Sequence, residues 1–146
     1  MIDTHCHIDD PQYAEGLSAF LDEQKAGGVE AMYVPGVDAS SVKDVLEVCD
    51  RYPDYLFPAL GLHPENVKED WREQLQTLKA AVDERMSNSP EGVPYPIAQR
   101  PISAKGLIAI GEIGLDYHWD VTFKAEQQEA LREQLRWAEQ YSLPVM

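Results

Sequence analysis

Short apolar runs alternate along the chain with segments of helical periodicity. Residues 1–6, 31–34, 56–61 and 107–113 are predicted as strands from their length and apolar content. In four intervening segments, apolar residues recur at spacings of three and four: Tyr13, Leu17, Phe20 and Leu21; Val42, Val45, Leu46 and Cys49; Trp71, Leu75, Leu78 and Val82; Leu131, Leu135 and Ala138. Repeated strand–helix units predict an α/β fold with a parallel sheet, either doubly wound or closed as a barrel.

Turn and cap residues set the expected boundaries within one domain covering residues 1–146. Asp10 followed by Pro11 predicts the start of the first helix, and Asp38 the start of the second. Residues 143–146 resemble the beginning of a fifth strand. Residues 86–105 contain four prolines without apolar periodicity, which predicts an inserted loop on the side of the sheet away from catalysis.

The composition limits the expected cellular location and binding partners of the protein. The net charge is −14, and the twelve lysines and arginines are scattered, so a polyanionic substrate would need bound metal ions or residues outside this chain. No apolar run approaches the roughly 18 residues that span a bilayer, and no secretory signal is visible. The two cysteines, Cys6 and Cys49, form no disulfide pattern. We therefore expect a cytoplasmic protein that does not enter membranes.

Two histidines near the start of the chain are the first candidate functional residues. His5 and His7 are two positions apart, which in a strand places both imidazoles on one side. Neutral imidazole is the commonest metal ligand, so the pair favours a metal site. The alternative is that one histidine caps a turn and the other packs in the core. Alternation directs Cys6 to the opposite side, where we expect a buried thiol.

Two further candidates lie where predicted strands end, which is where parallel α/β folds place their chemistry. His63 follows the third strand and Glu112 lies near the end of the fourth. Glu112 shares parity with Ile108 and Ile110, so we expect it to face the interior as they do. A buried carboxylate without a partner costs several kcal/mol, so Glu112 requires a cation or a proton. Exposure of Glu112 at the strand end is the alternative.

The motifs that contain these residues resemble the TatD family of metal-dependent deoxyribonucleases. They are Asp-Thr-His-Cys-His at 3–7, Gly-Leu-His-Pro at 61–64 and Gly-Glu-Ile-Gly-Leu-Asp-Tyr at 111–117. Gln127 and the segment 143–145 also fit the family pattern. The likeness extends over the chain apart from the proline-rich loop, and the third motif is the most specific of the three.

The resemblance implies a fold, cofactors and roles for the candidate residues. The fold is a TIM-type (β/α)8 barrel, of which this chain would cover about the first four βα units. Two divalent metal ions (magnesium, manganese or zinc) are implied, with His5, His7 and Glu112 as ligands and Glu112 bridging both ions. His63 matches a family residue placed for substrate, and DNA is the implied substrate, cleaved at its phosphodiester bonds. No residue of this chain is assigned a further catalytic role.

The chain also departs from the family pattern. A typical barrel of this kind needs about 250 residues, and the remaining family ligands, two histidines and a late aspartate, have no counterpart here. None of the three motifs contains a lysine or arginine. We therefore expect an incomplete metal site and very low activity of this chain alone, with self-association or a second chain completing the barrel. A small-molecule amidohydrolase and a catalytically inactive half-barrel fragment remain the alternative functions.

Overall fold

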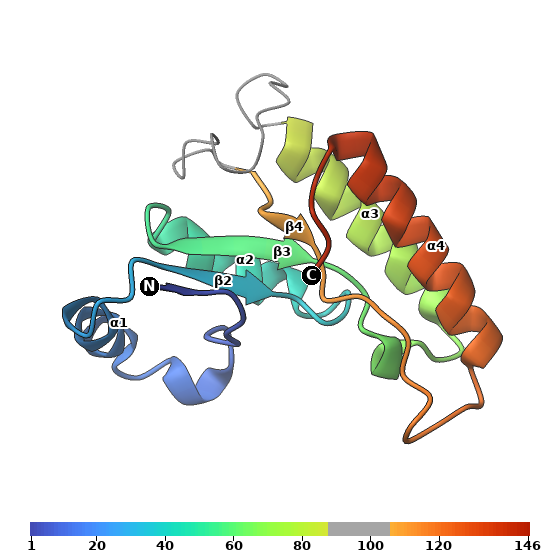
Figure 1. Cartoon of the computed structure of the whole chain (residues 1–146), viewed down its shortest axis with the longest axis horizontal. Coiled ribbons are helices and arrows are strands. Elements are labelled where there is room, and N and C mark those ends of the chain that lie inside the picture. Colours follow the sequence, from blue (N-terminus) through green and yellow to red (C-terminus); the bar gives the residue numbers. More distant parts are fainter. Residues whose placement is uncertain (88–105) are drawn as a thin grey trace.

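The computed structural model describes residues 1–87 and 106–146, and its centre is a parallel sheet (Figure 1). The strands follow one another across the sheet in chain order: β1 (Ile2–Asp3), β2 (Ala31–Pro35), β3 (Leu56–Leu60) and β4 (Ala109–Ile110). All three pairings are parallel. The α/β class and the parallel sheet predicted from the sequence are therefore confirmed.

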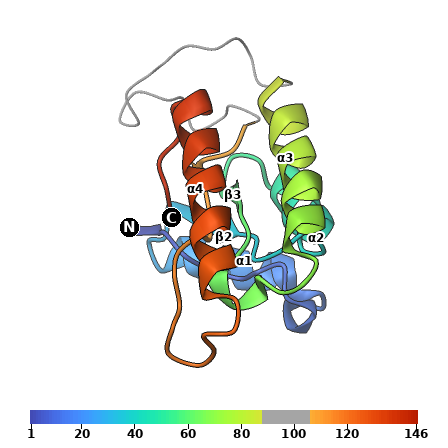
Figure 2. The same cartoon turned by 90° about the vertical axis from the view of Figure 1, so that its right-hand side faces the viewer.

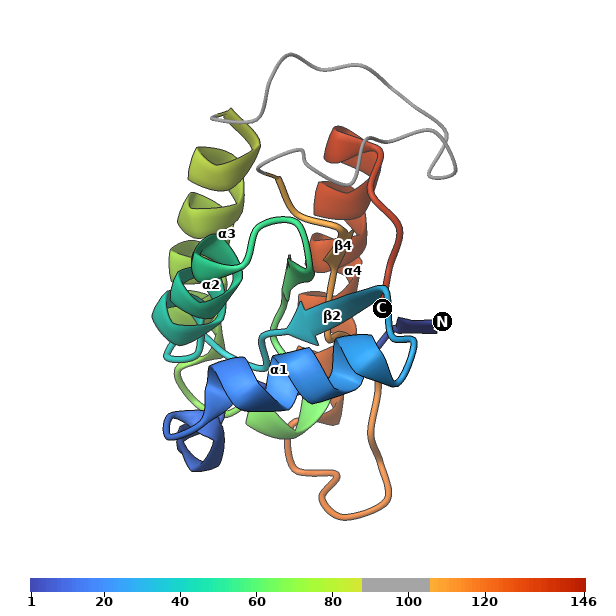
Figure 3. The same cartoon turned by 90° about the vertical axis from the view of Figure 1, so that its left-hand side faces the viewer.

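Helices occupy the connections between these strands. Helix α2 packs on β2 and β3, α4 packs on β4, and α3 lies beside α4 (Figures 1 and 2). Helix α1 lies at the opposite end of the sheet, near β1 and β2 (Figures 1 and 3). The bounds are α1 (Leu17–Ala26), α2 (Val42–Arg51), α3 (Trp71–Ser87) and α4 (Lys124–Tyr141), with short 3-10 turns η1 (Pro11–Tyr13) and η2 (Pro64–Asn66). None of the helices in the described ranges is both long and apolar enough to cross a membrane.

The main core lies between the sheet and the helices. Met32 pairs with Leu56, and Leu60 with Ile110, and all four side chains belong to the buried cluster that also contains residues of every α-helix. Residues paired side by side in a parallel sheet point to the same face. The helices therefore cover one face of the strands, as they do in one half of a barrel.

The C-terminal residues extend the sheet beyond β4. Ile110 lies opposite Val145 in a parallel bridge. The backbone N–H of Ile110 donates to Pro144 O, and that of Met146 to Ile110 O, each at 3.0 Å. The predicted start of a fifth strand at 143–146 is thus confirmed as a pairing partner of β4.

Several predicted boundaries were wrong because local hydrogen bonds interrupt the periodic pattern. The Asp10 carboxylate accepts from the N–H of Gln12 at 2.8 Å and caps η1 rather than the first helix. Gly16, with φ of +86°, separates this turn from α1, which begins at Leu17. The Asp38 carboxylate accepts from the N–H of Ser41 at 2.9 Å and caps the turn that leads into α2.

The outer strands and the last helix also differ from expectation. The first and fourth strands contain two residues each, rather than the predicted 1–6 and 107–113. On α4, Leu135 belongs to the periodic apolar stripe but is exposed, and the buried side chains are Gln127, Ala130, Gln134, Trp137 and Ala138. The apolar-periodicity rule misses this face because two of its buried members are amides, which bond to backbone groups.

The first two residues of the predicted loop at 86–105 belong to a helix instead. Helix α3 continues to Ser87, so residues 86 and 87 are helical. The rest of the predicted insertion, residues 88–105, lies outside the described residues.

Candidate metal centre

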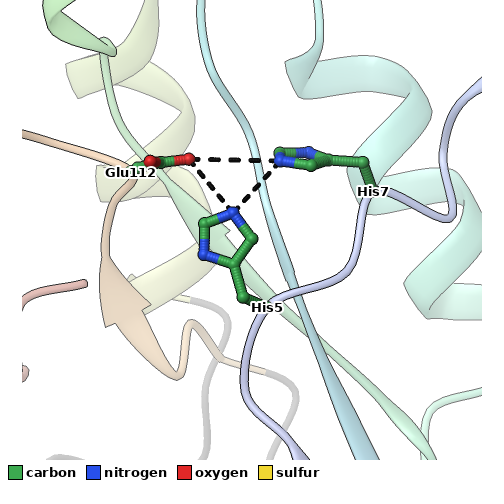
Figure 4. A group of neighbouring side chains, drawn as sticks. All are labelled: His5, His7 and Glu112. Carbon is green, nitrogen blue, oxygen red and sulfur yellow. Dashed lines mark hydrogen bonds and ion pairs between the residues drawn. The ribbon is translucent and has the colours of Figure 1, made fainter.

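Three side chains that follow the first and the fourth strand meet beyond the carboxyl ends of the strands. His5 and His7 follow β1, and Glu112 follows β4. The Nε2 atoms of the two histidines are 3.2 Å apart, and Glu112 Oε2 lies 3.2 Å from His5 Nε2 and 4.0 Å from His7 Nε2 (Figure 4). Residues more than one hundred positions apart in sequence thus converge on one point.

A turn, rather than a strand, directs the two histidines to the same side. Strand β1 ends at Asp3, whose carboxylate accepts from the backbone N–H of His5 at 3.0 Å. The backbone N–H of Cys6 donates to Tyr33 O at 3.0 Å and holds the segment against β2. The spacing of two therefore has the effect expected from the sequence, although strand alternation does not produce it.

Cys6 lies between the two histidines but does not join them. Its half-buried side chain packs against the core, and its Sγ donates weakly to Tyr33 O at 3.5 Å. Burial raises the pKa of the Cys6 thiol to about 12, with the Asp3 charge as a smaller cause. Only the thiolate is a good metal ligand, so Cys6 stays a neutral packing group at ordinary pH, in line with the buried thiol expected from the sequence.

Glu112 reaches the histidines because the chain leaves the strand before it. Its backbone N–H donates to Gly36 O at 3.0 Å, after the N–H of Gly111 has donated to Leu60 O at 3.0 Å. Parity with Ile110 predicted the same direction for both side chains, and this was wrong. Ile110 belongs to the core beneath the helices, whereas the Glu112 side chain, 27% exposed, joins His5. Alternation applies only within a strand, and β4 ends at Ile110.

Two glycines allow the strand ends to approach closely at this point. A Cβ on Gly61 would lie 2.6 Å from Ile113 Cγ2 and 2.8 Å from the carbonyl carbon of Gly111. A Cβ on Gly111 would lie 2.6 Å from the Cβ of Met146. These distances are shorter than van der Waals contact, so a side chain at either position would push the strand ends apart. The position of Glu112 therefore depends on glycine at both places.

His63 contacts the other carboxylate oxygen of Glu112, not the one that the histidine pair approaches. Its Nε2 is 3.4 Å from Glu112 Oε1, and its Nδ1 accepts from the backbone N–H of Glu65 at 3.2 Å. Because Nδ1 is an acceptor, the proton of the neutral ring resides on Nε2, which then donates toward Glu112. In this tautomer His63 is a hydrogen-bond donor at the site.

The chemistry and spacing of the donors fit a divalent metal ion. In a tetrahedral zinc site with ligands at 2.0–2.2 Å, neighbouring donor atoms lie about 3.3 Å apart, close to the distances of 3.2, 3.2 and 4.0 Å observed among His5, His7 and Glu112. The ligand atoms lie within 4.8 Å of one another. Both histidine side chains are 44% exposed. Three protein donors at an open site leave room for water or substrate, as in catalytic rather than structural metal sites.

Two buried glutamines of α4 support the loops of the site, and the sequence interpretation assigned them no role. Gln134 Oε1 accepts from the N–H of Leu62 at 2.6 Å, and its Nε2 donates to Leu62 O at 3.3 Å. Gln127 Oε1 accepts from the N–H of Asp116 at 3.0 Å. The two glutamines are seven residues apart, on the helix face that also carries Ala130 and Trp137. This spacing is the signal that could have identified both as buried.

Lys68 supplies a cation that the motifs did not reveal. It lies four residues beyond the turn at 61–64, and its Nζ is 4.0 Å from Asp120 Oδ2 in the loop after β4. Folding therefore brings the positive charge of Lys68 to the loop after β4, although the motif at 111–117 contains no lysine or arginine.

The amino-acid sequence matches the family described as TatD related DNase over residues 2–146, almost the whole chain. The chain belongs to the TatD family. Among curated TatD relatives, the metal-dependent hydrolase YabD of Bacillus subtilis is 31% identical over 100% of this chain and 49% of its own length. A protein of Erwinia tasmaniensis named 3'-5' ssDNA/RNA exonuclease TatD is 27% identical over 99% of this chain and 48% of its own length.

Solved structures of TatD proteins have the same fold. The crystal structure of YjjV, a TatD homologue from Escherichia coli K12, superposes with a TM-score of 0.78 at 34% identity, over 99% of this chain and 49% of that one. A TatD family hydrolase from Entamoeba histolytica gives 0.76 at 20% identity, over 99% and 48%. The chain thus spans about half the length of the relatives it matches, and its parallel strands correspond to the first half of a TatD barrel.

Proposed function

We propose that this chain provides the first metal ligands of a divalent-metal-dependent hydrolase that cleaves phosphodiester bonds in DNA. His5, His7 and Glu112 would hold a magnesium, manganese or zinc ion. The observation that supports this most directly is the convergence of two Nε2 atoms and a carboxylate oxygen within 4.8 Å at the carboxyl ends of the strands.

The remaining contributions come from side chains around these donors. A divalent ion held there would make a bound water acidic enough to serve as the nucleophile near neutral pH, and it would stabilise negative charge on phosphoryl oxygens. His5 and His7 would bind through Nε2 as neutral rings, and Glu112 would offset the positive charge. His63 presents an N–H at the same place, where it would donate to Glu112 or to a substrate oxygen.

Metal binding tests this proposal directly. Isothermal titration of the metal-free 146-residue chain with Mn²⁺ or Zn²⁺ should detect a site that the double variant His5→Ala, His7→Ala weakens at least 100-fold. His118→Ala is the matched control, because His118 is exposed in the loop after β4 and should leave the affinity unchanged. Equal affinities of the double variant and the unaltered chain would overturn the assignment.

The extent of turnover is a separate part of the proposal. The family resemblance implies a second ion, and apart from Glu112 the ligands of that ion have no counterpart in these 146 residues, so we expect very low hydrolysis of single-stranded DNA by this chain alone. Robust metal-dependent turnover by the purified chain would contradict this. A catalytically inactive half-barrel is the limiting case, in which metal binds and no DNA is cleaved.

A small-molecule amidohydrolase is the second candidate function. The net charge of −14 supports it, because an acidic protein repels a polyanion at long range. Comparing single-stranded DNA with a panel of amides and lactones would separate the two, using this chain together with any segment that completes the barrel. A cytoplasmic location remains a prediction from the sequence.

A further inference from the structure

An exposed tryptophan lies on the loop that follows the candidate metal ligand Glu112. The chain has three tryptophans, all in its described part, and Trp71 and Trp137 are buried, whereas Trp119 is 78% exposed. The His118 ring meets the indole edge-on, with the ring centroids 4.5 Å apart. A large aromatic side chain is thus offered to solvent on this loop.

The loop that carries Trp119 is fixed by hydrogen bonds within it and to α4. The Asp116 carboxylate accepts from the N–H of His118 at 2.7 Å, and the Asp120 carboxylate from the N–H of Thr122 at 2.8 Å. The bond from Asp116 N–H to buried Gln127 anchors the loop to α4. An aromatic side chain on a preorganised loop binds a planar ligand with little ordering cost.

A small pocket lies beside Trp119, and the backbone of one of its lining residues is hydrogen-bonded to a histidine of the candidate metal centre. Trp119, Phe123, Lys68 and Glu65 are among its lining residues. The backbone N–H of Glu65 donates to His63, which contacts Glu112. Among the described lining residues Lys68 is the one cation, and three are carboxylates: Glu65, Asp116 and Asp120. The pocket therefore offers a ligand aromatic contact rather than attraction for its phosphates.

We propose that Trp119 is a stacking platform for a nucleobase of a single-stranded nucleic acid whose phosphodiester lies at the metal centre. This inference rests on the proposed function, and it identifies a binding residue outside the metal ligands. Aromatic side chains that bind single strands stack on bases without requiring a particular sequence. Lys68 would contact a phosphate of the same strand, weakly because Asp120 shares its charge.

Fluorescence tests the platform without catalysis. Because Trp119 is the exposed one of the three tryptophans, adding a twelve-residue oligodeoxyadenylate to the 146-residue chain in EDTA should quench its emission, and an abasic oligonucleotide of equal length should not. By fluorescence anisotropy, Trp119→Ala should weaken binding of the oligodeoxyadenylate by roughly 5- to 100-fold and leave abasic binding unchanged. Trp119→Phe should retain most of the affinity.

Val121→Ala is the matched control, since Val121 is exposed on the same loop and should leave binding unaltered. The proposed stacking role is overturned if the unaltered chain shows no quenching. It is also overturned if Trp119→Ala weakens binding of both oligonucleotides equally, or weakens binding of neither. Titration with Mn²⁺ separates this failure from failure of the proposed function, because Trp119→Ala should bind the ion as the unaltered chain does.

Discussion

Individual side chains at the candidate centre differ in what they can give to a metal ion. His5 and His7 direct Nε2 at the shared point, whereas His63 has its Nδ1 occupied by the Glu65 N–H and its Nε2 directed at Glu112. A histidine that donates to a ligating carboxylate fixes its orientation and tunes its basicity. We therefore propose a positioning role for His63 in addition to the substrate contact proposed for it.

We expect His63→Ala to weaken metal binding by roughly 10- to 100-fold, because Glu112 loses the donor that orients its Oε1. His63→Asn, which keeps an N–H donor, should recover part of the affinity. Competition with a chromogenic chelator would measure all three proteins. If His63→Ala bound the metal as tightly as the unaltered chain, Glu112 would not depend on His63 for its orientation.

At this scale the sequence predicted which residues meet, but not how they are directed. Motif position and strand-end logic identified His5, His7, His63 and Glu112, and the structure brings all four together. The direction of Glu112 was not predictable, because it depends on where β4 ends. Gln134 was missed because an amide on a helix is usually exposed, and only the tertiary structure provides its partner, the backbone of Leu62.

At the scale of elements, close contact between strand ends positions the site. Gly61 follows β3 and Gly111 follows β4, and each faces backbone or side-chain atoms where a Cβ would stand. The sequence predicted β2 and β3 well, because continuous apolar runs of strand length identify buried parallel strands. It overextended β1 and β4, because each forms a regular ladder of only two residues. Beyond the β4 ladder, Ile108 and Gly111 still donate single backbone bonds to β3.

Gly61→Ala should shift Glu112 by overpacking the contact with Ile113 and Gly111. We expect a loss of about 1–3 kcal/mol in the free energy of unfolding, together with weaker metal binding. Urea denaturation and metal titration would measure the two effects. Gly114→Ala is the matched control and should be nearly neutral in both, because no atom lies within 4 Å of the place that its new Cβ would occupy. Equal behaviour of the two variants would show that the approach at Gly61 is not limiting.

For the molecule as a whole, the sheet has two edges with unpaired backbone groups. In the described chain, β1 pairs only with β2, and the segment 143–146 pairs with β4. Large apolar side chains are exposed at both edges, namely Met1, Ile2 and Val145. Edges of this kind favour strand addition by another chain.

The 146-residue chain should therefore associate in solution rather than remain a monomer. Size-exclusion chromatography with light scattering should give a mass above that of one chain, and Val145→Lys should reduce association because a lysine on an edge strand opposes pairing. Val121→Lys, at an exposed loop position away from both edges, should not. A well-folded monomer at micromolar concentration would refute the expectation.

The two glutamines of α4 have a consequence for recombination among TatD proteins. Gln134 and Gln127 bond to main-chain atoms of Leu62 and Asp116, not to their side chains. A chimera could therefore take the 61–64 turn from one parent and α4 from another and keep these bonds, provided that the α4 donor has glutamines at both places. The glutamines of α4 would therefore decide which crossover points keep these bonds. The loop side chains could change without breaking them.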